Sequence, residues 1–246
     1  MPDRATLKAK PRMVGMAQTC NSNDHPLAER FRAFIQDRNF PCVGAKSALA
    51  KGNMRIIIGR DLRSAWDDLR IHPALMEIAR DYALDPAPFQ SLAVLFEEDA
   101  GLDEAGFEQH LWQRLQSLSD KDDWLGQPVD PRVSGDPDDP HFSLSFGGEA
   151  FFVVGLHPGA SRPARRFDRP ALVFNLHDQF EQLRASGVYE KMRGTIIDRD
   201  VALAGAPNPM LARHGTISEA RQYSGRAVGS EWRCPLRPRK AAEHAA

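Results

Sequence analysis

The sequence has few cysteines and no long apolar run. Its three cysteines, Cys20, Cys42 and Cys234, cannot all pair with one another and form neither a CxxC pair nor a zinc-binding spacing. Such usage is typical of a reducing compartment, so we expect a cytoplasmic protein. No segment approaches the roughly 20 apolar residues needed to cross a bilayer, and the basic N-terminus has too few apolar residues for a signal peptide. We therefore expect no membrane partner.

The chain also lacks an excess of charge of either sign. Its 246 residues include 32 Lys and Arg and 33 Asp and Glu, which gives a formal net charge of -1. A protein with this balance has no global basic field to attract nucleic acid, so we expect no nucleic-acid partner. The motifs GxGxxG, GxxxxGKS, GxxxxGKT and GxSxG are absent, and the common nucleotide-binding and hydrolase folds therefore lose their main support.

What is present is the patterning of one globular domain. Hydrophobic residues make up 42% of the chain and charged residues 26%, which is ordinary for a domain with a substantial core. Neither an internal repeat nor a linker divides the sequence. We predict one domain over residues 25–236, between a disordered N-terminal arm (1–24) and a disordered tail (237–246).

The apolar spacing predicts both helices and strands. Helical periodicity is found over residues 25–38, 64–83, 103–118 and 178–203, with Pro73 expected to bend or split the second helix and Gly187 to interrupt the last. Apolar runs predict strands over 53–59, 89–97, 142–146, 150–156 and 171–176, and Gly147-Gly148 predicts a hairpin. Residues 40–46 are expected to form a compact turn. This order predicts an α+β fold with a mixed or antiparallel sheet and packed helices.

His157 follows a strongly apolar predicted strand and is succeeded by Arg162, Arg165 and Arg166. Pro158 keeps His157 out of helical geometry, and strand ends are stiff mounts for functional side chains. Because guanidinium groups match carboxylates, these arginines could hold an anion beside the histidine. The alternative is a loop histidine bonded to backbone, among solvated arginines.

A second histidine, His177, lies where a predicted strand meets a predicted helix. Asn175 is a candidate N-cap for that helix. His177 therefore faces either the helix start, bonded to local backbone, or a pocket.

Three acids, Glu97, Glu98 and Asp99, close another predicted strand. They could receive a guanidinium or amine group through charge-assisted hydrogen bonds. The alternative is a solvated surface run.

Several segments in a fixed order resemble the YqcI/YcgG family. They are FPCVGAK (40–46), FEQHLWQRLQSL (107–118), FSLSFGGEAFFVVGLHPGASRPARRF (142–167), LVFNLHDQFEQLR (172–184), NPML (208–211), and SEARQYSGR followed by WRCP (218–235). Within the family they are most similar to the haem-dependent N-hydroxylase type of the guanitoxin pathway. The resemblance extends over residues 25–236.

The resemblance implies a haem b cofactor whose iron uses dioxygen and an electron donor to hydroxylate a guanidine or amine nitrogen of arginine or a related compound. A haem needs an axial ligand and partners for its propionates. As ligand we rank His157 first, His177 second and Cys234, in a short Cys-Pro element, third. The candidates for propionate binding are Arg162, Arg165, Arg166, Arg221 and Arg226. The candidates for binding a cationic substrate are Glu97, Glu98 and Asp99.

Two other functions would use the same residues. A non-catalytic haem-binding sensor or carrier would fill both axial positions of the iron and leave no place for dioxygen. A haem-free binding protein for small molecules would stay colourless after titration with haem.

Overall fold

Five strands form one mixed sheet in the computed structural model, which describes residues 24–99, 101–212 and 215–239. The strands are β1 (Met54–Gly59), β2 (Ser91–Phe96), β3 (Leu144–Phe146), β4 (Glu149–Leu156) and β5 (Ala171–Leu176). Their order in the sheet is β1-β2-β5-β4-β3, with β1 and β2 parallel and all other neighbours antiparallel. The predicted α+β fold with a mixed sheet is confirmed.

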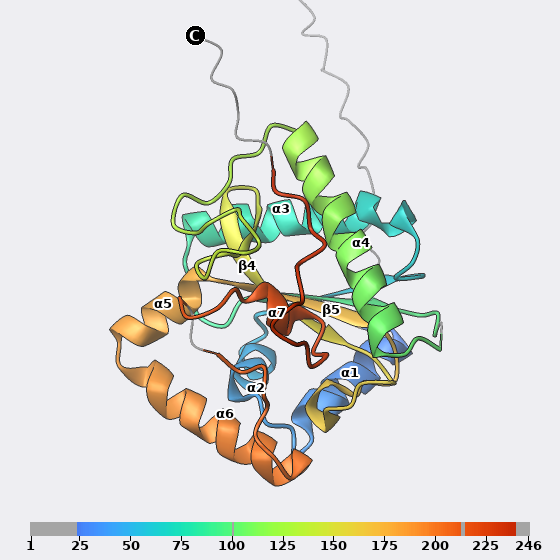
Figure 1. Cartoon of the computed structure of the whole chain (residues 1–246), viewed down its shortest axis with the longest axis vertical. Helices are drawn as coiled ribbons and strands as arrows, with labels where there is room; N and C mark the ends of the chain where they lie inside the picture. The colour runs from blue at the N-terminus through green and yellow to red at the C-terminus, as the bar shows by residue number, and fades with distance from the viewer. Residues whose placement is uncertain (1–23, 100, 213–214, 240–246) are drawn as a thin grey trace, which may run out of the picture.

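Helices cover both faces of this sheet. On one side lie α3 (Asp68–Leu84) and α4 (Glu104–Trp124), and on the other lie α1 (Pro26–Gln36), α2 (Val43–Ala50) and α6 (Val188–Ala204) (Figure 1). The remaining elements are α5 (Asp178–Ala185), α7 (Ala220–Tyr223) and the short 3-10 turns Ala65–Asp67 and Pro163–Arg165. The sheet is therefore the middle of three layers.

Side-chain alternation along β4 divides the core in two. Val153 packs in the larger apolar cluster with Phe107 and Leu111 of α4, whereas Leu156 packs in the smaller cluster with Phe31 of α1. This is the period of two expected of a strand that is covered on both faces. Odd-numbered and even-numbered residues of β4 thus face opposite layers, and this decides which of them meet a cavity.

The helices differ from their predicted bounds in three places. The expected turn at 40–46 begins α2 at Val43, with the Sγ atom of Cys42 accepting a hydrogen bond from the Ala45 N–H at 3.4 Å. Helix α2 has only eight residues, which is too short for a helical spacing of apolar residues to be recognised in the sequence. Helix α3 continues through Pro73 without a split. Helix α4 runs on to Trp124, because the buried Asp122 in its polar last turns is paired rather than solvated.

Other boundaries behave as expected. Gly187, with a φ of 73°, separates α5 from α6 and confirms the predicted interruption. The predicted arm up to residue 23 and the tail from residue 240 lie outside the described residues. Arg239, however, belongs to the described part and donates to the Asp122 carboxylate and to the Ser145 carbonyl. The packed region therefore extends beyond residue 236.

Candidate functional site

Two adjoining cavities lie between the sheet and helix α6. Their volumes are about 440 Å³ and about 250 Å³, and the larger one is in the range of small-molecule sites. Both are lined mainly by apolar side chains. The residues that line both cavities are Cys42, Phe152, Val154, Asn175, Arg193, Ile196, Ile197, Leu211 and Gln222.

Helix α6 creates this space by standing away from the sheet. None of its 17 residues is buried, and Ile196 and Ile197 line the cavities instead of completing the core. Gly187 and Gly205, both with positive φ, bracket the helix. An ion pair between Arg162 and Asp200 ties the helix to the turn that precedes β5. A helix with an apolar inner side over an unfilled sheet face is a natural wall for a ligand.

The larger cavity carries an excess of positive charge. Arg162, which also donates to the Ala206 carbonyl, is paired with Asp200. Arg165 donates to the backbone carbonyls of Gly155, Tyr223 and Gln222 at 2.9–3.2 Å. Desolvation lowers the pKa of Arg165 to about 10, and Cys42 and Asp200 oppose that shift. Within the described ranges no carboxylate forms an ion pair with Arg165.

The smaller cavity holds a buried histidine and a buried acid. The Nδ1 atom of His177 lies 3.7 Å from Oε2 of Glu219. The other carboxylate oxygen, Oε1, accepts hydrogen bonds from the hydroxyls of Ser143 at 2.7 Å and Tyr223 at 2.6 Å. Burial, followed by the charge of Glu219, raises the pKa of Tyr223 well above its usual value. The Tyr223 phenol therefore stays protonated and donates to the Glu219 side chain.

Two amides add hydrogen-bond acceptors to the wall of the smaller cavity. The Oε1 atom of Gln179 is buried without a donor among the described residues, while its Nε2 donates to the Gln90 carbonyl. Asn175 uses its Nδ2 on the carbonyls of Phe152 and Val173. The prediction that Asn175 caps a helix is wrong, because Asn175 lies within β5. His177 takes the N-cap position of α5 without a side-chain cap bond.

His157 lies on the opposite face of the sheet from the cavities. Its ring stacks on Phe107 of α4, with ring centroids 4.2 Å apart, and only 2% of the residue is exposed. It lines neither cavity. Its backbone N–H donates to the carbonyl of Arg165, so the two backbones are in contact, although only the Arg165 side chain lines a cavity. Burial lowers the pKa of His157.

Three of the predicted propionate ligands are engaged away from the cavities. Arg166 donates to the carbonyls of Ala160 and Ser161. Arg221 donates to two carbonyls and stacks over Trp232. Arg226 forms an ion pair with Glu108. Of the five predicted arginines, only Arg162 and Arg165 line a cavity.

Cys234 also lies away from both cavities. It packs against the larger apolar cluster. Burial raises the pKa of its thiol to about 12, which disfavours the thiolate that would bind iron.

The predicted substrate acids lie at the surface end of β2. Glu97 is 3.4 Å from Nε2 of His25. Glu98 accepts from Arg60 at 3.0 Å, and Asp99 accepts from the Gly101 N–H. None of the three lines a cavity. Their contacts are those of a surface run with its own counter-charges.

The cavity residues that the prediction missed include Arg193, Gln179, Glu219 and Cys42. Arg193 lies three and four positions before Ile196 and Ile197, so it shares the apolar side of the predicted helix. The sequence could therefore have indicated that Arg193 lies on the inner side of the helix. Glu219 and Cys42 lie inside the segments that resemble the family, but nothing in their spacing connects them to a pocket.

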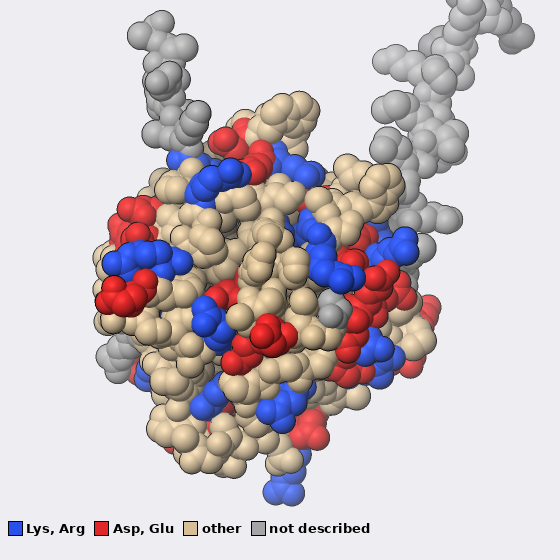
Figure 2. Space-filling view, turned by 45° about the vertical axis from the view of Figure 1, so that its right-hand side comes forward, with Lys and Arg blue, Asp and Glu red and all other residues tan. Residues whose placement is uncertain are grey.

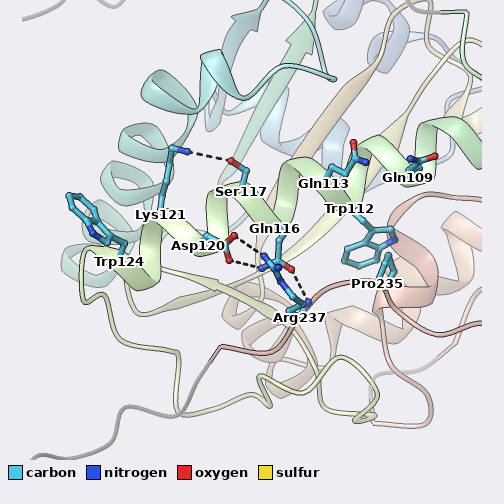
Figure 3. Close-up of a pocket in the computed structure, with 10 residues that line it drawn as sticks. All are labelled: Gln109, Trp112, Gln113, Gln116, Ser117, Asp120, Lys121, Trp124, Pro235 and Arg237. Atoms are coloured by element: carbon cyan, nitrogen blue, oxygen red, sulfur yellow. Dashed lines mark hydrogen bonds and ion pairs between the residues drawn. The ribbon is translucent and has the colours of Figure 1, made fainter.

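A third hollow is an open groove of about 730 Å³ along the outer side of α4 (Figure 3). It runs between Trp112 and Trp124, and Arg237 crosses it. The Arg237 backbone N–H donates to Gln116, and its guanidinium pairs with Asp120. None of the predicted site residues lines this groove, so the apolar cavities under α6 are the stronger candidate site.

Figure 2 shows basic and acidic side chains interspersed over the face that it displays. Among the described residues, no helix combines the length and apolar character that crossing a membrane requires. In the same part of the chain, no three His, Cys, Asp or Glu side chains gather as a site for a bare metal ion.

Sequence comparison identifies the family. A search of curated proteins and a search of solved structures each find no significant match. The sequence model of the YqcI/YcgG family matches residues 31–237, a range that includes α6, both cavities and nearly all of the described chain. The chain therefore belongs to the YqcI/YcgG family.

Proposed function

We propose that this chain is a haem-dependent N-oxygenase that hydroxylates a guanidine or amine nitrogen of arginine or a related compound. The observation that carries the proposal is the pair of apolar cavities under α6, with arginines in the larger one and His177 beside Glu219 in the smaller one. An apolar slot with cationic partners and an imidazole suits a flat, apolar group that carries two carboxylates. When bound, haem supplies an iron centre that activates dioxygen.

We propose that His177, rather than His157, would hold the haem iron, which reverses the order taken from sequence. His177 lines a cavity, and its Nδ1 lies near a carboxylate that Ser143 and Tyr223 hold in position. Histidines that bind metals usually donate their second ring N–H to such a group, which fixes the tautomer and makes the other nitrogen more basic. The His157 ring faces α4 instead.

Substrate binding is proposed for the amides of the smaller cavity. The Oε1 atom of Gln179, buried without a donor among the described residues, is ready to accept from a guanidine or amine N–H. Asn175 presents a second amide at the same wall. These residues replace Glu97, Glu98 and Asp99 in the proposal, because the amides line the cavity and the acids do not. The cysteine usage suits an enzyme of the cytoplasm, where reduced electron donors are available.

The test is an absorption spectrum of protein expressed with a haem precursor, followed by assays with L-arginine, dioxygen and a chemical reductant. We expect a Soret band in a ratio of one haem per chain, a band shift on adding L-arginine, and hydroxylated product only with dioxygen and reductant. A preparation that shows no Soret band after haem titration would overturn the proposal. Two protein ligands on the iron, with no dioxygen binding, would favour the sensor or carrier.

A further inference from the structure

We infer that Arg165 and Arg193 together bind a carboxylate of the ligand that occupies the larger cavity. The inference rests on the proposed function for the identity of that ligand, but the recognition chemistry stands on the charges of the cavity itself. Both guanidinium groups belong to the cavity wall, one before β5 and the other on α6. Arg193 also borders the smaller cavity.

Arg165 is a half-buried cation that forms no ion pair with an acid among the described residues. Its three hydrogen bonds go to backbone carbonyls of Gly155, Gln222 and Tyr223. These bonds fix the plane of the guanidinium group, and the nearest acid, Asp200, is shared with Arg162, with which it forms an ion pair. Desolvation lowers the pKa of Arg165 to about 10, yet an arginine keeps its proton at neutral pH. A fixed charge of this kind in an apolar wall is costly unless an anion joins it.

Arg193 adds a second cation to the same space. It is half-buried, and within the described chain it has neither an ion-pair partner nor a hydrogen-bond acceptor. Its neighbours on the inner side of α6 are Ile196 and Ile197, which cannot compensate its charge. An arginine on an otherwise apolar helix face that borders a cavity is well suited to contact a ligand.

Among the described residues, the wall of the larger cavity has one acid, and that acid is already engaged. Asp200 forms an ion pair with Arg162. Among the described lining residues, three arginines thus meet one carboxylate. The Nε atom of Arg162 is buried without a hydrogen-bond partner, which leaves one more donor unused. The missing partner is an anion, and the two-pronged shape of guanidinium groups favours a carboxylate.

Two sources supply this chemistry: a propionate of haem, or the carboxylate of an amino-acid substrate. Both present a carboxylate on a largely apolar or extended body. Arg165 and Arg193 would recognise either carboxylate. The two sources are therefore distinguished by comparing, for each source, two ligands that differ only in the carboxylate.

The first experiment compares haemin with haemin dimethyl ester, in which the propionates are blocked. Binding is followed by the Soret band for the wild type, Arg193→Met and Arg165→Lys, with Arg199→Met as the control on the exposed side of α6. If propionates are the source, the wild type prefers haemin, and Arg193→Met reduces that preference roughly tenfold or more. Arg165→Lys keeps a positive charge and hydrogen-bond donors but loses the two-pronged guanidinium group. It therefore tests carboxylate recognition without opening a gap in the cavity wall.

The second experiment compares L-arginine with agmatine, which lacks the carboxylate, on haem-loaded protein. If the substrate is the source, haemin binding is the same in the wild type and Arg193→Met. The variant instead loses the preference for L-arginine over agmatine, measured as ligand-induced spectral shifts. Arg199→Met should behave as the wild type in both experiments.

The third experiment needs no haem. Thermal unfolding of haem-free protein is measured with dodecanoate and with 1-dodecanol. A stabilisation by dodecanoate that depends on Arg193, in a protein that binds no haemin, would support the carboxylate site while refuting the proposed haem function. The inference is overturned if the wild type shows no preference for the carboxylate member of any pair. It is equally overturned if folded Arg193→Met and Arg165→Lys proteins keep every preference.

Discussion

The Nδ1 atom of His177 lies 3.7 Å from the Oε2 atom of Glu219 at the wall of the smaller cavity. We predict that Glu219→Gln weakens haem binding by about 10- to 100-fold, because the negative charge beside the proposed ligand is lost. Haem titration followed by the Soret band measures this. Glu98→Gln is the control, since Glu98 pairs with Arg60 at the surface and lines neither cavity. Equal affinity in Glu219→Gln and the wild type would contradict the pairing.

His157 is predicted to stabilise the fold without binding the cofactor. His157→Ala removes the stacking on Phe107 and opens a gap beside α4, which should lower the free energy of unfolding by about 1–3 kcal/mol. The haem spectrum should be unchanged, whereas His177→Ala should lose it. Denaturant unfolding and absorption spectra of the two variants measure both effects. A lost spectrum in a folded His157→Ala protein would restore the order taken from sequence.

The buried His157 should also make stability depend on pH. Burial is the main cause that lowers its pKa in the folded state, so the unfolded chain takes up the proton first as the pH falls. Its stabilising contribution is therefore complete above the unfolded pKa of about 6.5 and is lost progressively below it, toward the lowered folded pKa. His157→Phe keeps a ring against Phe107 but cannot titrate. We expect its unfolding free energy to fall less than that of the wild type between about pH 7.5 and 5. Parallel curves would refute the assignment.

Gln179 is predicted to act on the substrate and not on the cofactor. Gln179→Leu removes the buried Oε1 acceptor and should weaken L-arginine binding by roughly tenfold, while haem affinity stays the same. Titrations of L-arginine into haem-loaded protein measure this. Gln182→Leu is the matched control, because Gln182 is on the same helix and bonds to Tyr82 and Asp178 away from the cavities. Equal L-arginine affinity in both variants would remove Gln179 from the site.

The last described residue should anchor the C-terminal segment. Arg239 pairs with Asp122, which is fully buried and also contacts Nε2 of His72 at 2.9 Å. Arg239→Ala leaves that carboxylate with less compensation, so we expect the free energy of unfolding to fall by about 3–5 kcal/mol. Denaturant titration measures this, with Arg237→Ala as the exposed control. Equal stability of both variants would show that the segment is not anchored by this pair.

The sequence by itself determined the elements of the fold and their class. Local sterics between neighbours in the chain set these elements. They include the strands and helices read from periods of about 2 and 3.6, the Gly147-Gly148 hairpin and the break at Gly187. Because side chains alternate along a strand, the sequence also implied that Leu156 and His157 face opposite sides of the sheet. The sequence did not show which side α4 would fill and which side would stay open under α6.

Only the tertiary structure decided the candidate site, because a cavity is a property of layers that meet across long sequence separations. Helix α6 has apolar residues like any core helix, yet it stands off the sheet, held by Arg162 and Asp200. Glu98 closes an apolar strand, and for that reason the sequence predicted a substrate ligand. In the structure, Arg60, which is 38 residues away in the sequence, compensates the charge of Glu98 at the surface. Whether a charged side chain is free to bind a ligand depends on such distant partners, and no local pattern encodes them.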